Sequence, residues 1–361
     1  MHASSKLARL VVIVCVALSW VASGCSKDGG ISKPSLEIEH GWSALGSGMN
    51  GYVNALTEHD EWLVAGGRFT KAGDADVHCV AGWNGRSWTS LGAGTNNTVN
   101  AFAEYDGQLI AGGYFGIADY SYAHYIAAWD GSSWSRLGSG VNNAVSALVE
   151  YDGRLIAGGY FDTAGGVSAE GIAAWDGSFW APLGPGLEGD VTALAVHDGK
   201  LIAAGCFSVD GGSTYSRLAA WDGTSWSALP SGGLGGVLAL AEYDGRLIVG
   251  GEFYEMGGVA ARNIAAWNGN SWSPLGSGTN YHVHALAQYN SRLIAGGYFT
   301  SAGDTSASHI AAWDGSSWFP LGAGTNEEVY ALTVLNGRLI AGGEFDSAGT
   351  VSASHIAAWR D

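Results

Sequence analysis

The sequence predicts an all-β protein and, more narrowly, a seven-bladed β-propeller. Glycine accounts for 58 of the 361 residues and tryptophan for 16, and such a combination of tight turns and large apolar side chains favours packed strands. Fourteen tryptophans form two ladders whose neighbouring members are 46 residues apart: Trp42, Trp88, Trp134, Trp180, Trp226, Trp272 and Trp318, and Trp83, Trp129, Trp175, Trp221, Trp267, Trp313 and Trp359. A fixed spacing of this length is typical of a propeller or solenoid.

Each 46-residue unit predicts four short antiparallel strands. In the third unit we expect a first strand at residues 145–151 and a second at residues 154–159. The Asp152-Gly153 pair between them is typical of a tight hairpin, because both positions of such a turn need positive φ. After a loop of about ten residues, a third strand at 172–175 and a fourth at 180–183 complete a propeller blade.

The two ends of the repeat array predict how the ring closes. The array begins at Trp42, which belongs to a fourth strand, and it ends just after Trp359, which belongs to a third strand. An N-terminal outer strand that pairs with the last blade would supply the missing strand and cover an open edge. We therefore expect residues 41–361 to form one closed ring of seven blades.

The repeat resembles a known family. The order Leu-Ile-x-Gly-Gly, loop, short apolar strand, turn and Trp, as in residues 155–180, is similar to the kelch-type repeat, such as that of the central domain of galactose oxidase. The longer pattern also resembles repeats of secreted bacterial propellers and fungal cortical polarity markers. This resemblance implies a propeller that binds through the face carrying the loops between second and third strands and the connections from each fourth strand to the next first strand. The departure is Ala204-Gly205, where the other units have a double glycine.

The N-terminus predicts export. Lys6 and Arg9 precede an apolar run at residues 10–21, too short to cross a bilayer comfortably but suited to a signal peptide. The small residues before Cys25 resemble a bacterial lipoprotein processing site. We expect a signal peptide at 1–24, and a lipidated Cys25 with a flexible tether at 25–40. The protein would be a cell-envelope lipoprotein, sorted to the outer membrane, or a secreted or periplasmic protein.

Charge and cysteine content restrict the partners. The formal net charge of −17 would repel phosphate, so we expect no nucleic-acid partner. Once the signal peptide is removed and Cys25 is lipidated, Cys79 and Cys206 remain, about three units apart and too distant for a disulfide. The glycine-rich strings are turns and strand ends, and they predict no nucleotide site. We expect a monomer without a cofactor.

One loop departs most from the repeat and is our candidate ligand-binding site. Residues 114–125 carry four tyrosines where other units have small residues. Exposed tyrosines beside amides suit a sugar or a peptide, whereas packing of the loop on itself is the alternative. The candidate residues are Tyr114, Asp119, Tyr120, Tyr122, His124 and Tyr125, together with Asn96 and Asn97 from the same unit.

Two further groups are weaker candidates. His282 and His284 are two residues apart, so their imidazoles share a strand face, and Glu327 or Glu328 would supply a third metal ligand. Chance histidines at variable positions are the alternative, and we assign no metal. Glu252 and Glu344 follow the double glycines of two units and are a candidate acid/base pair for glycoside hydrolysis or polysaccharide elimination.

Three functions are compatible with the sequence. The first is a non-enzymatic, membrane-tethered propeller that binds an extracellular glycan, peptide or protein through its long-loop face. The second is a carbohydrate-active hydrolase or lyase with acids at the mouth of the central channel. The third is a structural scaffold of the envelope. Convergence of two carboxylates, or of histidine and carboxylates, within hydrogen-bonding distance at the channel mouth would favour the enzyme. A flat polar face would favour the binding module.

Overall fold

The computed structural model describes residues 40–209, 215–232 and 235–361. The predicted signal peptide at 1–24, Cys25 and nearly all of the predicted tether lie outside the described residues. Residues from His40 to Asp361 form one compact unit. Among the residues described, none belongs to a helix that could span a membrane.

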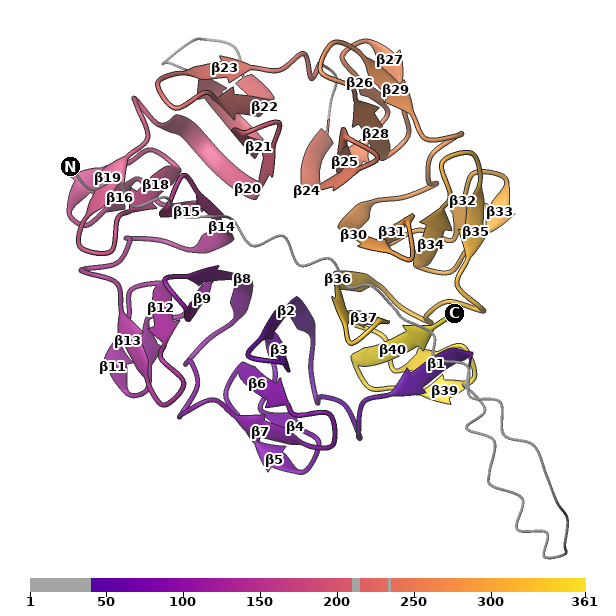
Figure 1. The fold of residues 1–361 in the computed structure, drawn as a ribbon, viewed down its shortest axis with the longest axis horizontal. Coiled ribbons are helices and arrows are strands. Elements are labelled where there is room, and N and C mark those ends of the chain that lie inside the picture. Colours follow the sequence, from indigo (N-terminus) through magenta and orange to yellow (C-terminus); the bar gives the residue numbers. More distant parts are fainter. Residues whose placement is uncertain (1–39, 210–214, 233–234) are drawn as a thin grey trace, which may run out of the picture. The chain divides into compact units, whose positions relative to one another are not determined.

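Seven four-stranded antiparallel sheets are arranged around a common centre, so the predicted seven-bladed propeller is confirmed (Figure 1). The strands of blades 1 to 3, from the centre outward, are β2 (Val53–His59), β3 (Trp62–Gly67), β6 (Val80–Trp83) and β7 (Trp88–Ser90); β8 (Val99–Tyr105), β9 (Gln108–Gly113), β12 (Ile126–Trp129) and β13 (Trp134–Arg136); and β14 (Val145–Tyr151), β15 (Arg154–Gly159), β18 (Ile172–Trp175) and β19 (Trp180–Pro182).

The other four blades repeat this order. Their strands are β20 (Leu187–His197), β21 (Lys200–Val209), β22 (Tyr215–Trp221) and β23 (Trp226–Ala228); β24 (Gly235–Tyr243), β25 (Arg246–Phe253), β28 (Ile264–Trp267) and β29 (Trp272–Pro274); β30 (Val283–Tyr289), β31 (Arg292–Gly297), β34 (Ile310–Trp313) and β35 (Trp318–Pro320); and β36 (Val329–Leu335), β37 (Arg338–Gly343), β40 (Ile356–Arg360) and β1 (Gly41–Ala44).

The ring closes as the sequence predicts. Strand β1 pairs antiparallel with β40, and Trp42 lies opposite Trp359. One apolar cluster joins Leu335 and Ile340 of blade 7 to Leu63 of blade 1. The first and last segments of the propeller therefore share one sheet, which leaves no unmatched half-blade.

The turns and strands follow from local chemistry. Asp152 and Gly153 have φ of 51° and 68°, as the Asp-Gly hairpin requires. In every blade the pairing of the two innermost strands shifts by one residue near its start, for example between Val145 and Ala147. This β-bulge leaves one extra residue, here Ser146, outside the ladder and re-aims its side chain.

Among the described residues, six loops contain a small hairpin that the sequence did not predict. These two-residue strands join the second and third strands of a blade. They are β4 (Lys71–Ala72) with β5 (Ala75–Asp76), β10 (Ile117–Ala118) with β11 (Ser121–Tyr122), β16 (Thr163–Ala164) with β17 (Val167–Ser168), β26 (Glu255–Met256) with β27 (Val259–Ala260), β32 (Ser301–Ala302) with β33 (Thr305–Ser306), and β38 (Ser347–Ala348) with β39 (Val351–Ser352).

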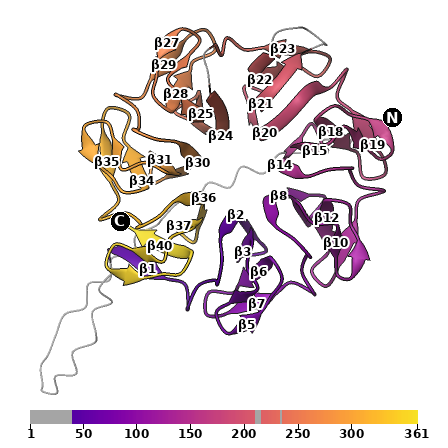
Figure 2. The same cartoon turned by 180° about the vertical axis from the view of Figure 1, so that it is seen from behind.

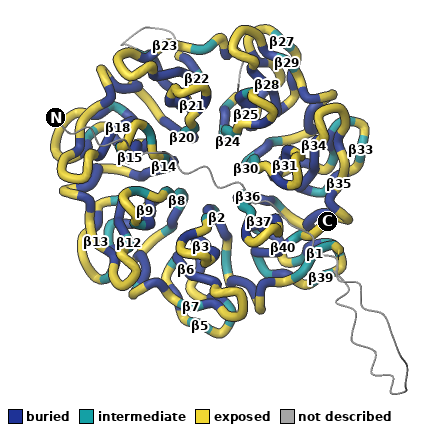
Figure 3. Tube along the Cα trace, in the orientation of Figure 1, coloured by how far each residue is buried: buried dark blue, intermediate teal, exposed yellow. Residues whose placement is uncertain are grey.

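Tryptophan and glycine hold neighbouring blades together. The indole N–H of Trp88 donates to the carbonyl of Leu45, which follows the outer strand of the preceding blade, at 2.8 Å. Gly112 lies against the next blade so closely that a Cβ there would stand 2.5 Å from Val145 Cγ1. Figure 3 shows buried residues along the strands and exposed residues mainly in the connections. The excess of both residue types is therefore architectural.

The alternation of strand directions gives the ring two different faces, which Figures 1 and 2 view from opposite sides. The loop face carries the long second-to-third connections, such as that between β3 and β6, and the entry to each innermost strand. The turn face carries the short hairpins, such as that between β2 and β3. The repeats differ in composition mainly on the loop face.

Candidate functional site at the inner rim

Three positions of each repeat lie close to the centre of the loop face. In blade 7 they are Glu328, just before the innermost strand, the bulged residue Tyr330, and Glu344, just after the paired glycines. The backbone N–H of Glu344 donates to the carbonyl of Glu328 at 2.9 Å. The Tyr330 hydroxyl donates to Glu344 Oε2 at 2.8 Å. We call these three positions in the seven blades the inner rim.

The inner rim is chemically uneven. In blades 1 to 4 it consists of Tyr52, Asn54 and Arg68; Thr98, Asn100 and Tyr114; Ala144, Ser146 and Tyr160; and Asp190, Thr192 and Cys206. In blades 5 to 7 it consists of Gly236, Leu238 and Glu252; His282, His284 and Tyr298; and Glu328, Tyr330 and Glu344. Histidine and glutamate thus concentrate on one side of the ring.

His284 is the centre of this concentration. Its Nε2 lies 3.4 Å from Glu328 Oε2 of the next blade, and each of the two side chains is 24% exposed. Its imidazole also lies 6.1 Å from the ring of His282 and 5.6 Å from the ring of Tyr330, measured between centroids. Blades 6 and 7 are therefore joined at the rim by polar and aromatic contacts.

Burial sets the protonation states. Burial and, to a lesser extent, the neighbouring His282 lower the pKa of His284 to about 4, so the imidazole is neutral at pH 7. Burial also raises the pKa of Glu328. Burial and the hydrogen bond to Glu344 raise the pKa of Tyr330 above its usual range, so the phenol keeps its proton. The site offers neutral donors and acceptors beside carboxylates.

The rim continues on both sides of this pair. His282 Nε2 lies 3.6 Å from Glu252 Oε1 of blade 5, and the Tyr281 and Tyr298 rings lie 5.4 Å apart. Tyr281 is 51% exposed and Tyr298 is 44% exposed. Both aromatic faces are therefore accessible beside the histidines.

On the other side, the ring of Tyr52 in blade 1 lies 6.5 Å from Tyr330 and 5.7 Å from His355. A hydrogen bond to Glu344 raises the pKa of Tyr52. Tyr52, His355 and Arg68 also line an open cavity of about 280 Å³. The contacts thus run from blade 5 through blades 6 and 7 to blade 1.

The histidine pair does not form a metal site in the part of the chain that the structure describes. There, no group of three or more His, Cys, Asp or Glu side chains is arranged to hold a metal ion. His282 and His284 contact different carboxylates, and Glu327 is exposed. We therefore find no support for the metal hypothesis.

The candidate acids also have separate partners. Glu252 contacts His282, whereas Glu344 accepts a hydrogen bond from the Tyr330 hydroxyl. Neither is paired with the other among the contacts of the described residues. His284 and His282 nevertheless lie 3.4 and 3.6 Å from carboxylates of neighbouring blades. We expected histidine and carboxylates within hydrogen-bonding distance for a catalytic site, so acid/base catalysis stays a candidate.

The structure separates the aromatic residues of the predicted binding loop. Tyr114 belongs to the inner rim and is 48% exposed. Tyr120 and Tyr122, which are 91% and 72% exposed, line an open hollow of about 580 Å³ beside the outer strand of blade 2. The ring of His124 stacks on Tyr122 at 6.0 Å, and half-buried Tyr125 packs into an apolar cluster. The loop therefore presents two separate aromatic surfaces.

The remaining candidates of this loop have structural hydrogen bonds. Asp119 has a φ of 43° at a position where other blades have glycine, and its Oδ2 accepts a hydrogen bond from the backbone N–H of Trp134 at 2.6 Å. Asn96 accepts hydrogen bonds from the N–H groups of Gly116 and Ile117, both at 3.0 Å. Asn97 accepts one from the Thr98 N–H at 2.8 Å. These three side chains order the backbone of blade 2.

Cys79 and Cys206 are both free thiols. Cys79 is half-buried, and burial raises the pKa of its thiol. Cys206 is exposed at the inner rim of blade 4. No disulfide joins them, in agreement with the spacing of the repeat.

Comparison with known proteins supports the class of fold. Residues 197–219 match a family described as a domain of unknown function (DUF5122) β-propeller. The WD40 β-propeller domain of Doa1 is 14% identical, with a TM-score of 0.53, and the alignment covers 89% of this chain and 96% of that one. U3-55K is 14% identical, with a TM-score of 0.56 and coverage of 89% and 98%.

A computationally designed protein, Ika8, is also similar. It is 16% identical, with a TM-score of 0.51, and the alignment covers 88% of this chain and 99% of that one. A search of curated protein sequences finds no match to this chain. At these identities the solved structures show a β-propeller fold and nothing about ligands.

Sequence reasoning named His282, His284, Glu252, Glu328 and Glu344 but did not join them into one site. It missed Tyr330 and Tyr52, because each stands beside an apolar strand start that looks the same in every unit. A comparison of the bulge position across all seven repeats would have found Tyr330, and a comparison of the position just before each innermost strand would have found Tyr52. The bulge position is the clearer signal. That position changes residue in almost every blade, whereas its neighbours stay apolar.

Proposed function

We propose that this propeller is a non-enzymatic binding module that engages an extracellular glycan at the inner rim of blades 5, 6, 7 and 1. The observation that carries the proposal is the continuous set of contacts from Glu252 through His282, His284, Glu328 and Tyr330. It lies on the loop face, where recognition residues on a rigid scaffold are usually found.

The chemistry of this set suits a sugar. The exposed rings of Tyr281, Tyr298 and Tyr52 offer faces for stacking on the apolar side of a sugar ring. Between them, carboxylates accept hydrogen bonds from sugar hydroxyl groups, and the neutral imidazole of His284 both accepts and donates them. The acidic character of the protein disfavours polyanionic glycans and favours neutral or cationic ones.

A second candidate function is acid/base catalysis on a carbohydrate. The observation that favours it is the neutral His284 imidazole 3.4 Å from the Glu328 carboxylate, beside the protonated phenol of Tyr330. A neutral imidazole would act as a base and a phenol as an acid. Release of reducing ends or of unsaturated products from a bound glycan would establish this function in place of simple binding.

A glycan array with four forms of the full chain tests the proposal. The rim variant carries Tyr281→Asn and His284→Ser, the residues that blade 3 has at Asn143 and Ser146. The outer variant carries Tyr120→Asp and Tyr122→Ser, the residue types of blade 6 at Asp304 and Ser306.

The control variant is Phe179→Ser, an exposed turn-face position that is serine in blades 1, 2, 4, 5 and 6. We expect the rim variant to lose the signal of the unmodified chain and the control to keep it. Loss in the outer variant alone would transfer the site to the predicted tyrosine loop. An unmodified chain that binds no glycan would contradict the proposal.

We also propose that the protein is a monomer that is anchored to a membrane through a lipid on Cys25. We propose further that its repeat is kelch-like, which would agree with ligand binding through the loop face. Export is supported by the charge and apolar run of residues 6–21. Mass spectrometry of the mature N-terminus tests the anchor. A lipid-sized increase on Cys25 is expected, and an unmodified first residue would exclude it.

A further inference from the structure

The grooves between blades on the turn face are filled by tyrosine in four places. The last residue of the innermost strand leans across the groove and packs into the apolar cluster of the next blade, beside that blade's third-strand tryptophan. The four residues are Tyr105, Tyr151, Tyr243 and Tyr289. Each groove of this kind therefore accommodates a phenol.

The hydroxyl of this tyrosine has a defined acceptor. Tyr151 donates to the carbonyl of Gly199 at 3.2 Å, and Tyr243 donates to the carbonyl of Ser291 at 3.2 Å. Both carbonyls belong to the hairpin between the two innermost strands of the next blade. The groove thus combines an apolar wall for the ring with a backbone acceptor for the hydroxyl.

Between blades 1 and 2 the tyrosine is replaced by His59. This imidazole is 8% exposed and turns toward carboxylates, with Nδ1 2.8 Å from Glu104 Oε1 and Nε2 3.6 Å from Asp60 Oδ2. It is shorter than a phenol and leaves the groove partly empty. The result is a cleft of about 350 Å³, which His59 lines together with residues of both blades.

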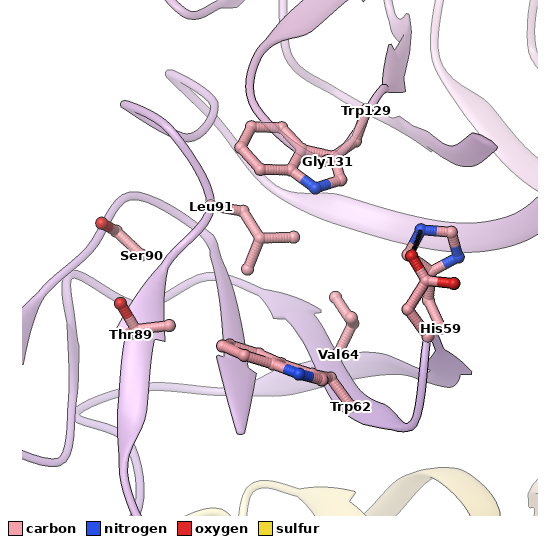
Figure 4. A pocket seen from close by; sticks show the side chains of 9 residues that line it. His59, Trp62, Val64, Thr89, Ser90, Leu91, Trp129 and Gly131 are labelled. Carbon is pink, nitrogen blue, oxygen red and sulfur yellow. Dashed lines mark ion pairs between the residues drawn. The ribbon is translucent and has the colours of Figure 1, made fainter. Parts of the chain in front are cut away.

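Two indoles form the walls of this cleft. Figure 4 shows Trp62 and Trp129 on opposite sides, with Leu91 and Val64 between them. Trp62 is 39% exposed and stands where four other blades have arginine. It lies against Gly82, where a Cβ would be 3.0 Å from the indole and where all other blades have alanine. Two departures from the repeat therefore act together: Trp62 supplies the indole, and Gly82 leaves room for it.

The cleft occupies the place of the missing phenol. In the filled grooves the Tyr105 hydroxyl lies close to Gly177, and the Tyr243 hydroxyl lies close to Gly315. The equivalent glycine between blades 1 and 2 is Gly131, which lines the cleft. Trp129 is half-buried, whereas Trp175, which Tyr105 covers, is 8% exposed.

We infer that this cleft is a binding site for a single hydroxylated aromatic ring, the chemistry shared by a free phenol and a tyrosine side chain. The ring takes the position that the protein's own tyrosines take in four other grooves, between Trp62 and Trp129. Its hydroxyl is directed to the hairpin of blade 2, where Gly107 has the place of Gly199. This site is on the turn face and is independent of the inner rim.

The groove between blades 4 and 5 provides a matched comparison within the chain. There His197 also replaces the tyrosine, and its Nδ1 lies 3.1 Å from Glu242 Oε2. Lys200 and Ala220 stand at the positions of Trp62 and Gly82, so the indole wall is missing, and Trp267 is 9% exposed. The histidine alone therefore does not create the site.

The test is a calorimetric titration of the full chain with p-cresol, the side-chain analogue of tyrosine. His59→Tyr supplies the phenol from within, Trp62→Arg restores the residue of the other blades, and His197→Tyr is the matched control. N-acetyltyrosine amide and methyl glucoside are the other probes. Thermal unfolding identifies any variant that fails to fold.

We expect p-cresol to bind the unmodified chain and His197→Tyr equally, and to bind both other variants at least about tenfold more weakly. Binding of the tyrosine amide as well would assign the source to a peptide, and binding of p-cresol alone would assign it to a free phenol. Equal binding by His59→Tyr, absence of p-cresol binding, or binding of methyl glucoside in its place would overturn the inference.

Discussion

The two halves of the inner rim have the same backbone and different chemistry. In blades 2 and 3 the rim presents tyrosine beside small or neutral residues, such as Asn100 and Ser146. In blades 6 and 7 the same positions hold His284, Glu328 and Tyr330, which contact each other. The strand pairing and the bulge are identical on both sides.

This difference shows that the scaffold leaves its rim positions free to vary. The tryptophans and paired glycines hold the blades, and none of them is needed at the rim. Because the bulged residue is outside the ladder, its identity changes without a cost in strand pairing. A propeller of this kind acquires a site by changing a few rim residues in neighbouring blades.

The largest expected effect is on the pH dependence of stability. The folded pKa of His284, about 4, is below the value of about 6.5 for an unfolded histidine. The unfolded chain therefore binds more protons between these values, and stability falls as the pH decreases from about 6.5 to 4. The total loss from this group is on the order of 3 kcal/mol.

His284→Ser should flatten this dependence, whereas Ser146→Ala in the neutral half should leave it unchanged. Urea unfolding at a series of pH values measures both. Other acids also titrate in this range, so the slopes of the variants are compared with that of the unmodified chain. An unchanged slope in His284→Ser would show that its imidazole is not held neutral by burial.

The second prediction tests whether the two halves share one scaffold. Gly112→Ala in blade 2 and Gly296→Ala in blade 6 each place a Cβ within 2.5 to 2.6 Å of a valine in the next blade. We expect both to lower the free energy of unfolding by about 1–3 kcal/mol. Markedly unequal losses in denaturant unfolding would contradict the equivalence of the two halves.

The third prediction concerns a hydrogen bond specific to the polar half. Tyr330→Phe removes the donor to Glu344 and should cost about 1–2 kcal/mol, because that carboxylate is half-buried. The matched change is Asn100→Ala in blade 2, whose side chain has two long hydrogen bonds: it donates to the carbonyl of Val145 at 3.4 Å and accepts from Asn54 Nδ2 at 3.5 Å. We expect it to cost about 0.5 kcal/mol, and a larger loss than in Tyr330→Phe would reverse the comparison.

The smallest effect is expected for the exposed aromatic residue. Tyr281→Asn in blade 6 and its converse, Asn143→Tyr in blade 3, should change stability by less than about 0.5 kcal/mol. Both side chains are exposed, so the exchange alters the rim surface without altering the core. Thermal unfolding measures this, and a loss near 2 kcal/mol would mean that Tyr281 is structural.

Most of the fold could be predicted, because the ladders continue at one spacing without insertion. Trp42 and Trp359 even predicted the closing pair of strands. The small hairpins such as β4 with β5 were missed, since two-residue strands have no detectable alternation. The site was predicted only in part. The pattern indicated that His282 and His284 share a face, but which blade supplies each partner depends on packing across the ring.

The tyrosine loop at residues 114–125 shows a different limit of prediction from sequence: the unusual segment was found, but the roles of its residues were not. Its unusual composition was evident, but Tyr114 and Tyr120 lie on different parts of blade 2, and Asp119 serves the backbone. Residue type alone does not separate a side chain that replaces a glycine from one that meets a ligand. The role of the exposed tyrosines remains a prediction.

The most direct test of the central claim is hydrogen–deuterium exchange of the full chain with and without the glycan selected on the array. If the polar half of the inner rim is the binding site, exchange should slow in residues 281–284 and 327–330 and stay unchanged in residues 98–100 and 144–146. Protection confined to residues 114–125, or equal protection around the whole ring, would contradict it.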